Sequence, residues 1–270
     1  MRLIVSCLSI RYMQVIHREY NAREQSISHS AQSFMPGLSA QVAVIIPTLD
    51  EQDSIVQVVK AIPRELAQRI IVADGGSRDE TVSRARSAGA EVIESGRGYG
   101  RACLSGLQFA AGAEVLVFMD GDGADDAGAM VKLVEPILSG DYDFVIGSRA
   151  RGTRAPGSMA WHQLAAGRLA GLGMQLLYGI RYTDMCAFRA IRRAALLRLG
   201  MKELTYGWNL EMQMRAARSG LRILEIPVNY RCRSAGESKV AGSLFGSIRA
   251  GALIARTFAR VAGELLSSPR

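Results

Sequence analysis

Residues 115–123 read VLVFMDGDG, an apolar run that ends in two carboxylates separated by one glycine. Five successive apolar residues, Val115–Met119, are typical of a strand that is buried on both faces. Open α/β sheets bind their ligands beyond the carboxyl ends of the strands, so we expect Asp120 and Asp122 at a ligand site. Their oxygens suit Mg²⁺ or Mn²⁺, which bridge to phosphates. Taken alone, the run is equally compatible with a polar turn and two solvated aspartates.

The same order of apolar strand and polar turn recurs through the first half of the chain. Strands are predicted at 42–46, 70–73, 91–94, 115–119, 142–146 and, later, 222–229. Helices are predicted at 55–62, 130–138, 159–178, 192–199 and 208–218. This alternation predicts βαβ units and a mostly parallel sheet, with polar turns along one edge where phosphate and sugar groups would bind. Ser77 is expected to cap the helix that follows it, with Glu80 as the partner in a capping box.

Composition narrows the class of protein. The chain has 270 residues, 49% of them hydrophobic, enough for one α/β domain with a full core. Its four cysteines are far apart and form no CxxC pair, which disfavours a disulfide framework or a zinc site and favours a reducing compartment. The net charge of +8 calls for an anionic partner. Aromatic residues are only 6% and do not alternate with basic ones, so nucleic acid is disfavoured as that partner.

Several common enzyme motifs are absent from the sequence. Gly96, Gly98 and Gly100 follow a predicted strand, but their spacing is not G-x-G-x-x-G, which disfavours a dinucleotide-binding enzyme. The chain has no G-x-x-x-x-G-K-[ST] phosphate loop and no nucleophile elbow. The expected chemistry therefore centres on the carboxylate pair.

The two ends of the chain differ from its middle. Residues 1–40 show no sustained periodicity and are predicted to be a loose extension, followed by the main domain at 41–240. Residues 241–270 are predicted to form a basic amphipathic helix, with Phe258 and Val261 opposite Arg256. This helix either lies at an anionic membrane surface or packs on the domain, and the sequence leaves both open. No apolar run reaches the roughly 18 to 20 residues that span a bilayer, so we expect a cytoplasmic protein, in peripheral contact with the membrane if the helix binds it.

Further short motifs surround the carboxylate pair in one fixed order. They are IPTLDE at 46–51, DGGSRDET at 74–81, GYGRA at 98–102, GSR at 147–149, TD at 183–184 and EIP at 225–227. With this set the chain resembles the family-2 glycosyltransferases of GT-A fold, most of all the branch that transfers mannose or glucose to dolichyl or polyprenyl phosphate. The resemblance implies a single Rossmann-like α/β domain whose mostly parallel sheet is flanked by helices. Three positions depart from the family pattern: Asp50 replaces Asn, Gly75 replaces Asp and Tyr99 replaces Lys.

The resemblance also implies roles for individual residues. Those expected to line the nucleotide-sugar pocket are Pro47, Asp50, Glu51, Asp74, Gly98 and Asp120. Asp120 and Asp122 would face the donor diphosphate through Mg²⁺ or Mn²⁺, because a departing nucleoside diphosphate builds up negative charge. Basic side chains could clamp donor or acceptor phosphates or could form a solvated rim. These side chains are Arg149, Arg231, Arg233 and Lys239.

Together these features predict a metal-dependent, inverting glycosyltransferase with Asp122, Arg149 and Glu211 as catalytic residues. It would move a hexose from a nucleotide-diphosphate sugar, such as GDP-mannose or UDP-glucose, to a polyprenyl phosphate at the cytoplasmic membrane face. Glu211 would serve as a base for a hydroxyl acceptor, or would orient the sugar or a neighbouring arginine. Alternatives are a small soluble or hydroxyl acceptor, a nucleotidyltransferase, and a catalytically lapsed module that binds nucleotide sugar or lipid.

Overall fold

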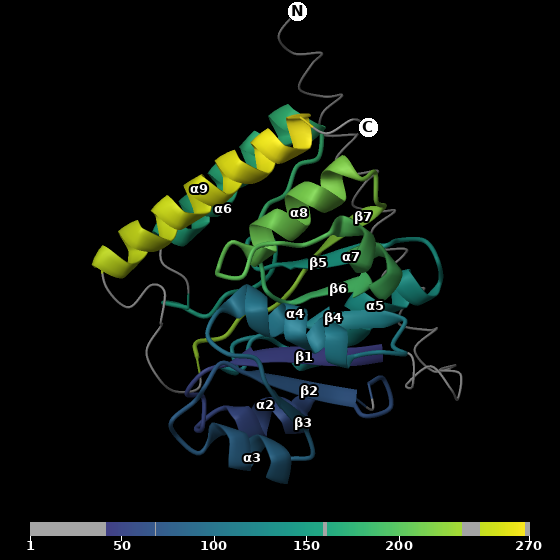
Figure 1. Cartoon of the computed structure of the whole chain (residues 1–270), viewed down its shortest axis with the longest axis vertical. Coiled ribbons are helices and arrows are strands. Elements are labelled where there is room, and N and C mark those ends of the chain that lie inside the picture. The colour runs from purple at the N-terminus through teal and green to yellow at the C-terminus, as the bar shows by residue number, and fades with distance from the viewer. Residues whose placement is uncertain (1–41, 68, 159–160, 234–243, 268–270) are drawn as a thin grey trace, which may run out of the picture. The chain divides into compact units, whose positions relative to one another are not determined.

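A computed structural model describes residues 42–67, 69–158, 161–233 and 244–267 of the chain (Figure 1). The predicted extension at 1–40 and the candidate phosphate ligand Lys239 lie outside the described residues. Within these ranges the strands form a single sheet in the order β3-β2-β1-β4-β6-β5-β7. The strands are β1 Val42–Thr48, β2 Arg69–Asp74, β3 Glu91–Glu94, β4 Val115–Phe118, β5 Phe144–Ser148, β6 Arg189–Arg192 and β7 Ile223–Pro227.

Helices cover both faces of this sheet and give it three layers. The helices are α2 Ile55–Ala61, α3 Thr81–Ser87, α4 Tyr99–Phe109, the 3₁₀ turn η2 Ala127–Ala129, α5 Met130–Leu138, α6 Trp161–Tyr178, α7 Arg193–Leu199, α8 Trp208–Arg218 and α9 Leu244–Ser267. Successive strand side chains point to opposite faces, so the odd and even positions of β1 enter different cores. Val44 packs with α2, α3 and α5, whereas Ile45 packs with α4 and α6 to α9. This architecture confirms the expected α/β fold.

Strand β6 was not predicted from the sequence. It runs antiparallel between β4 and β5, while β1, β2, β3 and β4 pair in parallel, as do β5 and β7. Only Ala190 and Ile191 of its four residues are apolar, and Arg189 is fully buried. Its Nη1 donates to the carbonyl of Asn209 at 3.1 Å, and its guanidinium also bonds the carbonyl of Cys186. Backbone carbonyls thus satisfy the buried guanidinium of Arg189, a group that the hydrophobic pattern would predict to be exposed to solvent.

The predicted helix cap at Ser77 is wrong. Helix α3 begins at Thr81 and its N-cap position is Glu80, which makes no side-chain capping bond. The Ser77 hydroxyl instead donates to Asp74 Oδ1 at 2.5 Å and accepts from the backbone N–H of Asp50 at 2.8 Å. The serine therefore ties the loops after β1 and β2 together rather than starting a helix.

The amphipathic helix near the carboxyl end packs on the domain through its apolar face. Val261 is fully buried, and Ile254, Phe258 and Leu265 pack against the same core as α8. On the polar face Arg260 binds Glu203 at 2.8 Å. Among the residues that the structure describes, none of the helices combines the length and hydropathy that crossing a bilayer requires. The larger described apolar side chains of α9 from Ile254 to Leu265 therefore contribute to the core of the domain.

Two glycines allow opposite predictions for the same substitution. A Cβ at Gly100, in the first turn of α4, would overlap the carbonyl oxygen of Glu203, whereas one at Gly263 in α9 would meet no atom within 4 Å. We expect Gly100→Ala to lower the free energy of unfolding by about 1 to 3 kcal/mol through overpacking. Gly263→Ala should raise it by about 0.5 to 1 kcal/mol, because alanine loses less conformational entropy in a helix. Urea denaturation of both variants measures the two values, and equal effects would contradict the packing at Gly100.

Candidate active site

The loops after β1 and β2 are joined into one surface by backbone hydrogen bonds. The N–H of Gly75 donates to the carbonyl of Thr48 at 2.8 Å, and the N–H of Glu51 donates to Thr81 Oγ1 at 2.8 Å. A Cβ at Gly75 would lie 3.2 Å from that Thr48 oxygen, so a side chain there would press on the β1 loop. The glycine that replaces a family aspartate therefore lets the two loops approach closely.

Asp50 and Asp74 shape these loops with their side chains. Asp74 is 3% exposed, and its Oδ2 accepts the N–H groups of Gly76 at 2.9 Å and Ser77 at 3.0 Å. Asp50 has a left-handed backbone with φ of 50°, a conformation that Asp and Asn adopt more readily than most residues. Its Oδ1 accepts the N–H of Arg78 at 2.8 Å. Asp thus serves the same backbone need as the Asn usual in the family.

Three aspartates gather in the turn after β4. Asp122 is 2% exposed and Asp125 is 8% exposed, while Asp120 is half-buried. The N–H of Asp120 donates to Asp125 Oδ2 at 3.1 Å, and the N–H of Ala124 donates to Asp122 Oδ1 at 3.0 Å. Sequence reasoning missed Asp125. Its only signal was an acid five residues after Asp120, and nothing in that spacing shows that the turn folds back.

Burial and nearby carboxylates raise the pKa values of Asp120 and Asp125. Burial, with the charge of Asp122, raises the pKa of Asp120 to about 6, against the opposing effect of Arg149 and Arg233. Burial and the charges of Asp120 and Asp122 raise the pKa of Asp125 to about 8. At Asp120 and Asp125 burial therefore outweighs the arginines, and both carboxyls hold a proton more tightly than a solvated aspartate does.

The segment after β7 brings basic residues to this turn. The backbone N–H of Arg231 donates to the carbonyl of Ala124 at 2.9 Å, which fixes the segment beside the aspartates. Arg233 Nε lies 3.0 Å from Asp122 Oδ2, and Arg231 Nη2 lies 3.6 Å from Asp126 Oδ1. The structure thus brings the pair Asp120 and Asp122 together with Arg231 and Arg233, which lie 109 to 113 residues later in the sequence.

Arg149 forms an ion pair with Asp184, a residue for which the sequence predicted no role. Its Nε and Nη2 bind Asp184 Oδ2 and Oδ1, each at 2.8 Å, and its guanidinium lies 4.9 Å from the ring centre of Tyr230. Burial alone would raise the pKa of Asp184, but the hydrogen bonds from Arg149 hold that pKa below its ordinary value. Arg149 acts on the aspartates by its charge, while its hydrogen bonds anchor the carboxyl end of β5 to the residues before β6.

Asp120 and Asp122 are the residues of the turn after β4 that would hold a divalent cation. In the described ranges no group of three or more His, Cys, Asp or Glu side chains is arranged to hold a metal ion by itself. Asp120 and Asp122 nonetheless present hard oxygen donors on one turn, two residues apart. Mg²⁺ and Mn²⁺ usually take one or two carboxylates and complete their coordination with phosphate and water. Two carboxylates therefore suffice for such a cation only when substrate supplies the rest.

The glycine turn before α4 owes its composition to packing against another loop. A Cβ at Gly98 would overlap the carbonyl oxygen of Leu204, and the N–H of Arg101 donates to that oxygen at 3.1 Å. Between the glycines, Tyr99 stacks on Tyr206 with ring centres 6.4 Å apart. Its buried hydroxyl has no hydrogen-bond partner among the described residues, and burial with the charge of Asp120 raises its pKa. A nucleotide-binding role for Gly98 stays a prediction.

Glu211 lies inside the domain rather than at the carboxylate turn. It is fully buried, and its Oε2 accepts the N–H groups of Lys202 at 3.0 Å and Glu203 at 2.7 Å. Its Oε1 accepts from Arg215 Nε at 2.9 Å and lies 3.7 Å from Arg260. Of the roles considered for Glu211, orienting a neighbouring arginine matches these contacts. A base must reach its acceptor, and both oxygens are engaged elsewhere.

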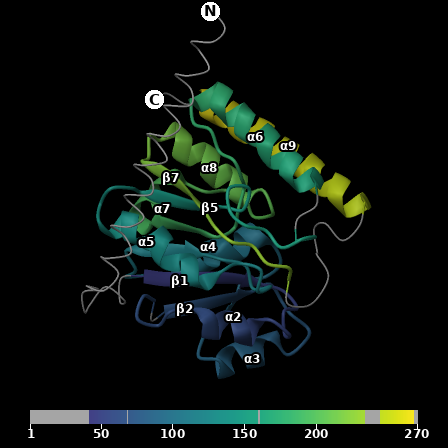
Figure 2. The same cartoon turned by 180° about the vertical axis from the view of Figure 1, so that it is seen from behind.

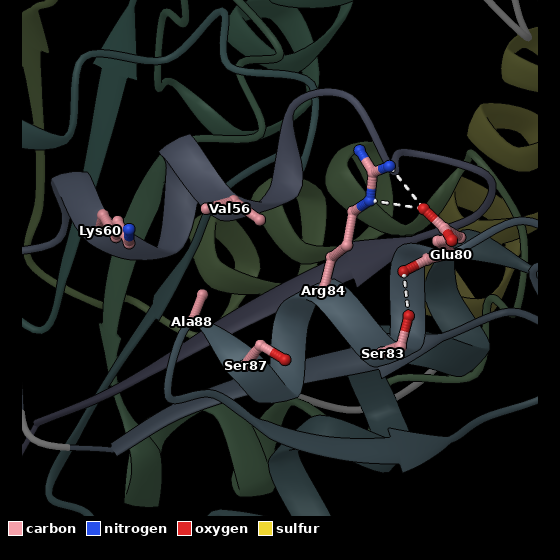
Figure 3. A pocket seen from close by; sticks show the side chains of 7 residues that line it. All are labelled: Val56, Lys60, Glu80, Ser83, Arg84, Ser87 and Ala88. Carbon is pink, nitrogen blue, oxygen red and sulfur yellow. Dashed lines mark hydrogen bonds and ion pairs between the residues drawn. The ribbon is translucent and has the colours of Figure 1, made fainter.

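A separate hollow of about 270 Å³ lies on the surface between α2 and α3 (Figure 3). Its lining includes Val56, Lys60 and Arg84. Figure 3 shows the Arg84 guanidinium turned toward Glu80, which it binds at 2.5 Å, and Arg84 also donates to the carbonyl of Gln52. None of the candidate site residues lines this hollow, so it is distinct from the carboxylate turn.

Comparison with known proteins agrees with this geometry. The sequence profile described as "Glycosyl transferase family 2" matches residues 43–200. An uncharacterized glycosyltransferase of Mycobacterium tuberculosis (strain ATCC 25618 / H37Rv) is 37% identical over 77% of this chain and 93% of its own length. The undecaprenyl-phosphate mannosyltransferase of Micrococcus luteus is 30% identical over 76% of this chain and 90% of its own.

A solved structure shows the same fold. It is glucosyl-3-phosphoglycerate synthase from Mycobacterium tuberculosis in complex with Mn²⁺, UDP-glucose and phosphoglyceric acid, with a TM-score of 0.66. The two proteins are 22% identical, and the match covers 83% of this chain and 80% of that one. The profile match and the mycobacterial relative confirm the resemblance found in the sequence. This chain belongs to glycosyl transferase family 2.

Proposed function

We propose that this protein is an inverting, metal-dependent hexosyltransferase that uses a nucleotide-diphosphate sugar and a polyprenyl phosphate acceptor. The observation that carries the proposal is the turn after β4, where Asp120 and Asp122 lie beside a segment that holds Arg231 and Arg233. Carboxylates for a cation and arginines for phosphate are the two requirements of moving a sugar between phosphate groups. A mannosyltransferase among the relatives takes undecaprenyl phosphate by its name, which favours that acceptor class.

The donor would bind across the carboxyl ends of β1, β2 and β4. Asp50, Glu51 and Asp74 lie in the joined loops there, after the buried Pro47. Gly98 is proposed at the rim of the same pocket. The proposed donor is GDP-mannose or UDP-glucose. Both are kept because no described side chain in these loops distinguishes one base or sugar from the other.

Sugar transfer would proceed by in-line attack on the anomeric carbon. An acceptor phosphate oxygen forms the new glycosidic bond as the bond to the nucleoside diphosphate breaks on the opposite side, which inverts the configuration. Such an acceptor is already anionic at neutral pH, so it needs little help from a base. Asp120 and Asp122 would hold Mg²⁺ or Mn²⁺, which offsets charge on the diphosphate when bound. This assignment leaves Glu211 as a positioning residue, with Arg149 fixing the wall of the site.

Arg231 should affect acceptor binding more than turnover. Its side chain is 66% exposed and lies 3.6 Å from Asp126, so it remains accessible to a phosphate. We expect Arg231→Ala to raise KM for the acceptor about tenfold, the effect of losing one charge-assisted contact, with kcat nearly unchanged. Steady-state kinetics at varied acceptor concentration gives both constants. Arg198→Ala on α7 is the matched control, and an equal change in that variant would indicate a general charge effect. Arg233 and Lys239 complete the proposed clamp.

A donor screen tests the proposed reaction. Purified protein is incubated with GDP-mannose or UDP-glucose, with Mg²⁺ or Mn²⁺ or after chelation, and with or without a short-chain polyprenyl phosphate. Release of nucleoside diphosphate that requires metal and lipid phosphate supports the proposal and names the donor. Release with phosphoglyceric acid but not with the lipid would assign a small soluble acceptor. Donor binding without release from either acceptor would instead indicate a binding module.

A further inference from the structure

We propose that the outer face of α6 docks this protein on an anionic lipid bilayer. The inference rests on the proposed function in one respect, because a polyprenyl acceptor resides in a membrane. The docking surface is defined by the side chains of Leu169, Leu172 and Leu176. Its position, charge and connection to the active site each support the assignment.

The three leucines form one stripe that faces away from the domain. They are 70%, 53% and 79% exposed, respectively, and their spacing of three and four residues places them on one side of the helix. The opposite side holds Ala170 and Met174, which are buried in the core. Isolated exposed leucines are common, but a contiguous apolar stripe on a helix marks an interaction site.

The charge around the stripe favours lipid headgroups as the partner. Residues 144–183 contain five arginines and no lysine, aspartate or glutamate. Two of these arginines, Arg168 and Arg181, are exposed on and just after α6. An apolar stripe with basic neighbours and no carboxylates is the composition that enters an anionic interface, with leucines among the acyl chains and arginines at the phosphates.

Helix α9 lies beside α6, at the edge of the leucine stripe. A Cβ at Gly173 would lie 2.7 Å from the ring of Phe258, so the two helices touch where α6 has no side chain. Figures 1 and 2 show α6 and α9 running side by side beyond α8. Phe258 and Val261 of α9 pack into the domain core, whereas the three leucines of α6 remain exposed.

The connection between β5 and β6 links the stripe to the active site. This connection contains α6, and its two ends are held together by the Arg149–Asp184 ion pair and by a 2.7 Å hydrogen bond between Ser148 and Thr183. Docking through α6 would therefore place the end of β5, and the phosphate-binding arginines near it, close to the headgroup layer. A lipid phosphate could then reach the site while its chain stayed in the bilayer.

Vesicle flotation tests the docking surface with the full chain. The protein is mixed with vesicles of phosphatidylglycerol and phosphatidylcholine in equal parts, or of phosphatidylcholine alone. We expect binding to the anionic vesicles that falls about tenfold or more in the triple variant Leu169→Gln, Leu172→Gln and Leu176→Gln. Leu197→Gln on α7 is the matched control, because Leu197 is 51% exposed outside the stripe. Equal binding by wild type and triple variant, or no binding by wild type, would overturn the proposal.

Two further measurements separate the possible causes of a negative result. Sedimentation velocity without lipid detects self-association, and a dimer that the triple variant abolishes, without vesicle binding, would assign the stripe to a second copy of this chain. Activity on a water-soluble, short-chain polyprenyl phosphate should be equal in wild type and triple variant, because that acceptor needs no bilayer. Vesicle binding without any such activity would refute the proposed function and leave the docking surface standing.

Discussion

Asp122→Ala will lower the rate of nucleoside diphosphate release by about a hundredfold to a thousandfold, the usual effect of removing one group that stabilises developing charge. Asp122 is 2% exposed and stands between Asp120 and Arg233, so its loss removes one of two carboxylates offered to the cation. The expected change is in kcat and in the metal concentration needed for half-maximal rate. Coupled measurement of nucleoside diphosphate against Mn²⁺ concentration gives both values.

The loss of activity should occur without loss of the fold. Removing the charge of Asp122 breaks its ion pair with Arg233 but relieves the repulsion that helps raise the pKa values of Asp120 and Asp125. These effects oppose each other, so we expect the midpoint of thermal unfolding to move by only a few degrees, about 1 kcal/mol or less. Asp141→Asn, at an exposed acid beyond α5, is the control and should retain full activity. An Asp122→Ala variant with wild-type turnover would exclude the carboxylate pair as the catalytic centre.

Glu211→Gln should destabilise the protein by about 3 kcal/mol, the lower end of the range for breaking a buried ion pair. The amide keeps an oxygen for the N–H groups of Lys202 and Glu203. Arg215, whose side chain is only 10% exposed, keeps Glu264 at 2.7 Å but loses the other of its two carboxylate partners. Urea denaturation measures the difference. Glu114→Gln is the matched control: Glu114 binds Arg192 at 2.5 Å but its side chain is 41% exposed, so its loss should be worth less than about 1 kcal/mol.

The same variant separates a positioning role from a catalytic one. If Glu211 positions the loop at 202–206, folded Glu211→Gln should retain kcat within about tenfold at low temperature, because a phosphate acceptor needs no strong base. A base for a hydroxyl acceptor would be worth about a hundredfold to ten-thousandfold. A rate loss of that size, with normal unfolding behaviour, would indicate that Glu211 is a catalytic base. The acceptor group would then be a hydroxyl and not a lipid phosphate.

Sequence patterns correctly predicted several of the helices and strands. The bounds of β3 at Glu91–Glu94, α5 at Met130–Leu138 and α8 at Trp208–Arg218 agree with those predicted from periodicity and turn residues. Strand β6 was not predicted because its buried Arg189 is polar, and its hydrogen bonds to the carbonyls of Cys186 and, 20 residues away, Asn209 depend on the fold. A hydrophobic pattern predicts burial only where the buried side chains are apolar.

The sequence predicted the motifs of the candidate site but not the ion pairs and hydrogen bonds between residues that are distant in the chain. Asp120 and Asp122 follow a recognisable strand, whereas the approach of Arg233 depends on a segment 111 residues later. The contact between Glu211 and Arg215 could have been expected, since residues four apart on a helix are neighbours. The bonds from Glu211 to the N–H groups of Lys202 and Glu203 depend on how the preceding loop folds back, which no spacing encodes.

The packing of α9 on the domain affects the order in which the chain can fold during synthesis on the ribosome. Arg260 of α9 binds Glu203, and Arg215 of α8 binds Glu264 of α9 at 2.7 Å, so the loop before α8 is fixed partly from the carboxyl-terminal side. Since synthesis runs from the amino end, the sheet and its carboxylate turn can form while this loop still lacks its partners. In a nascent chain the loop at 202–206 would therefore reach its final contacts only after α9 had left the exit tunnel.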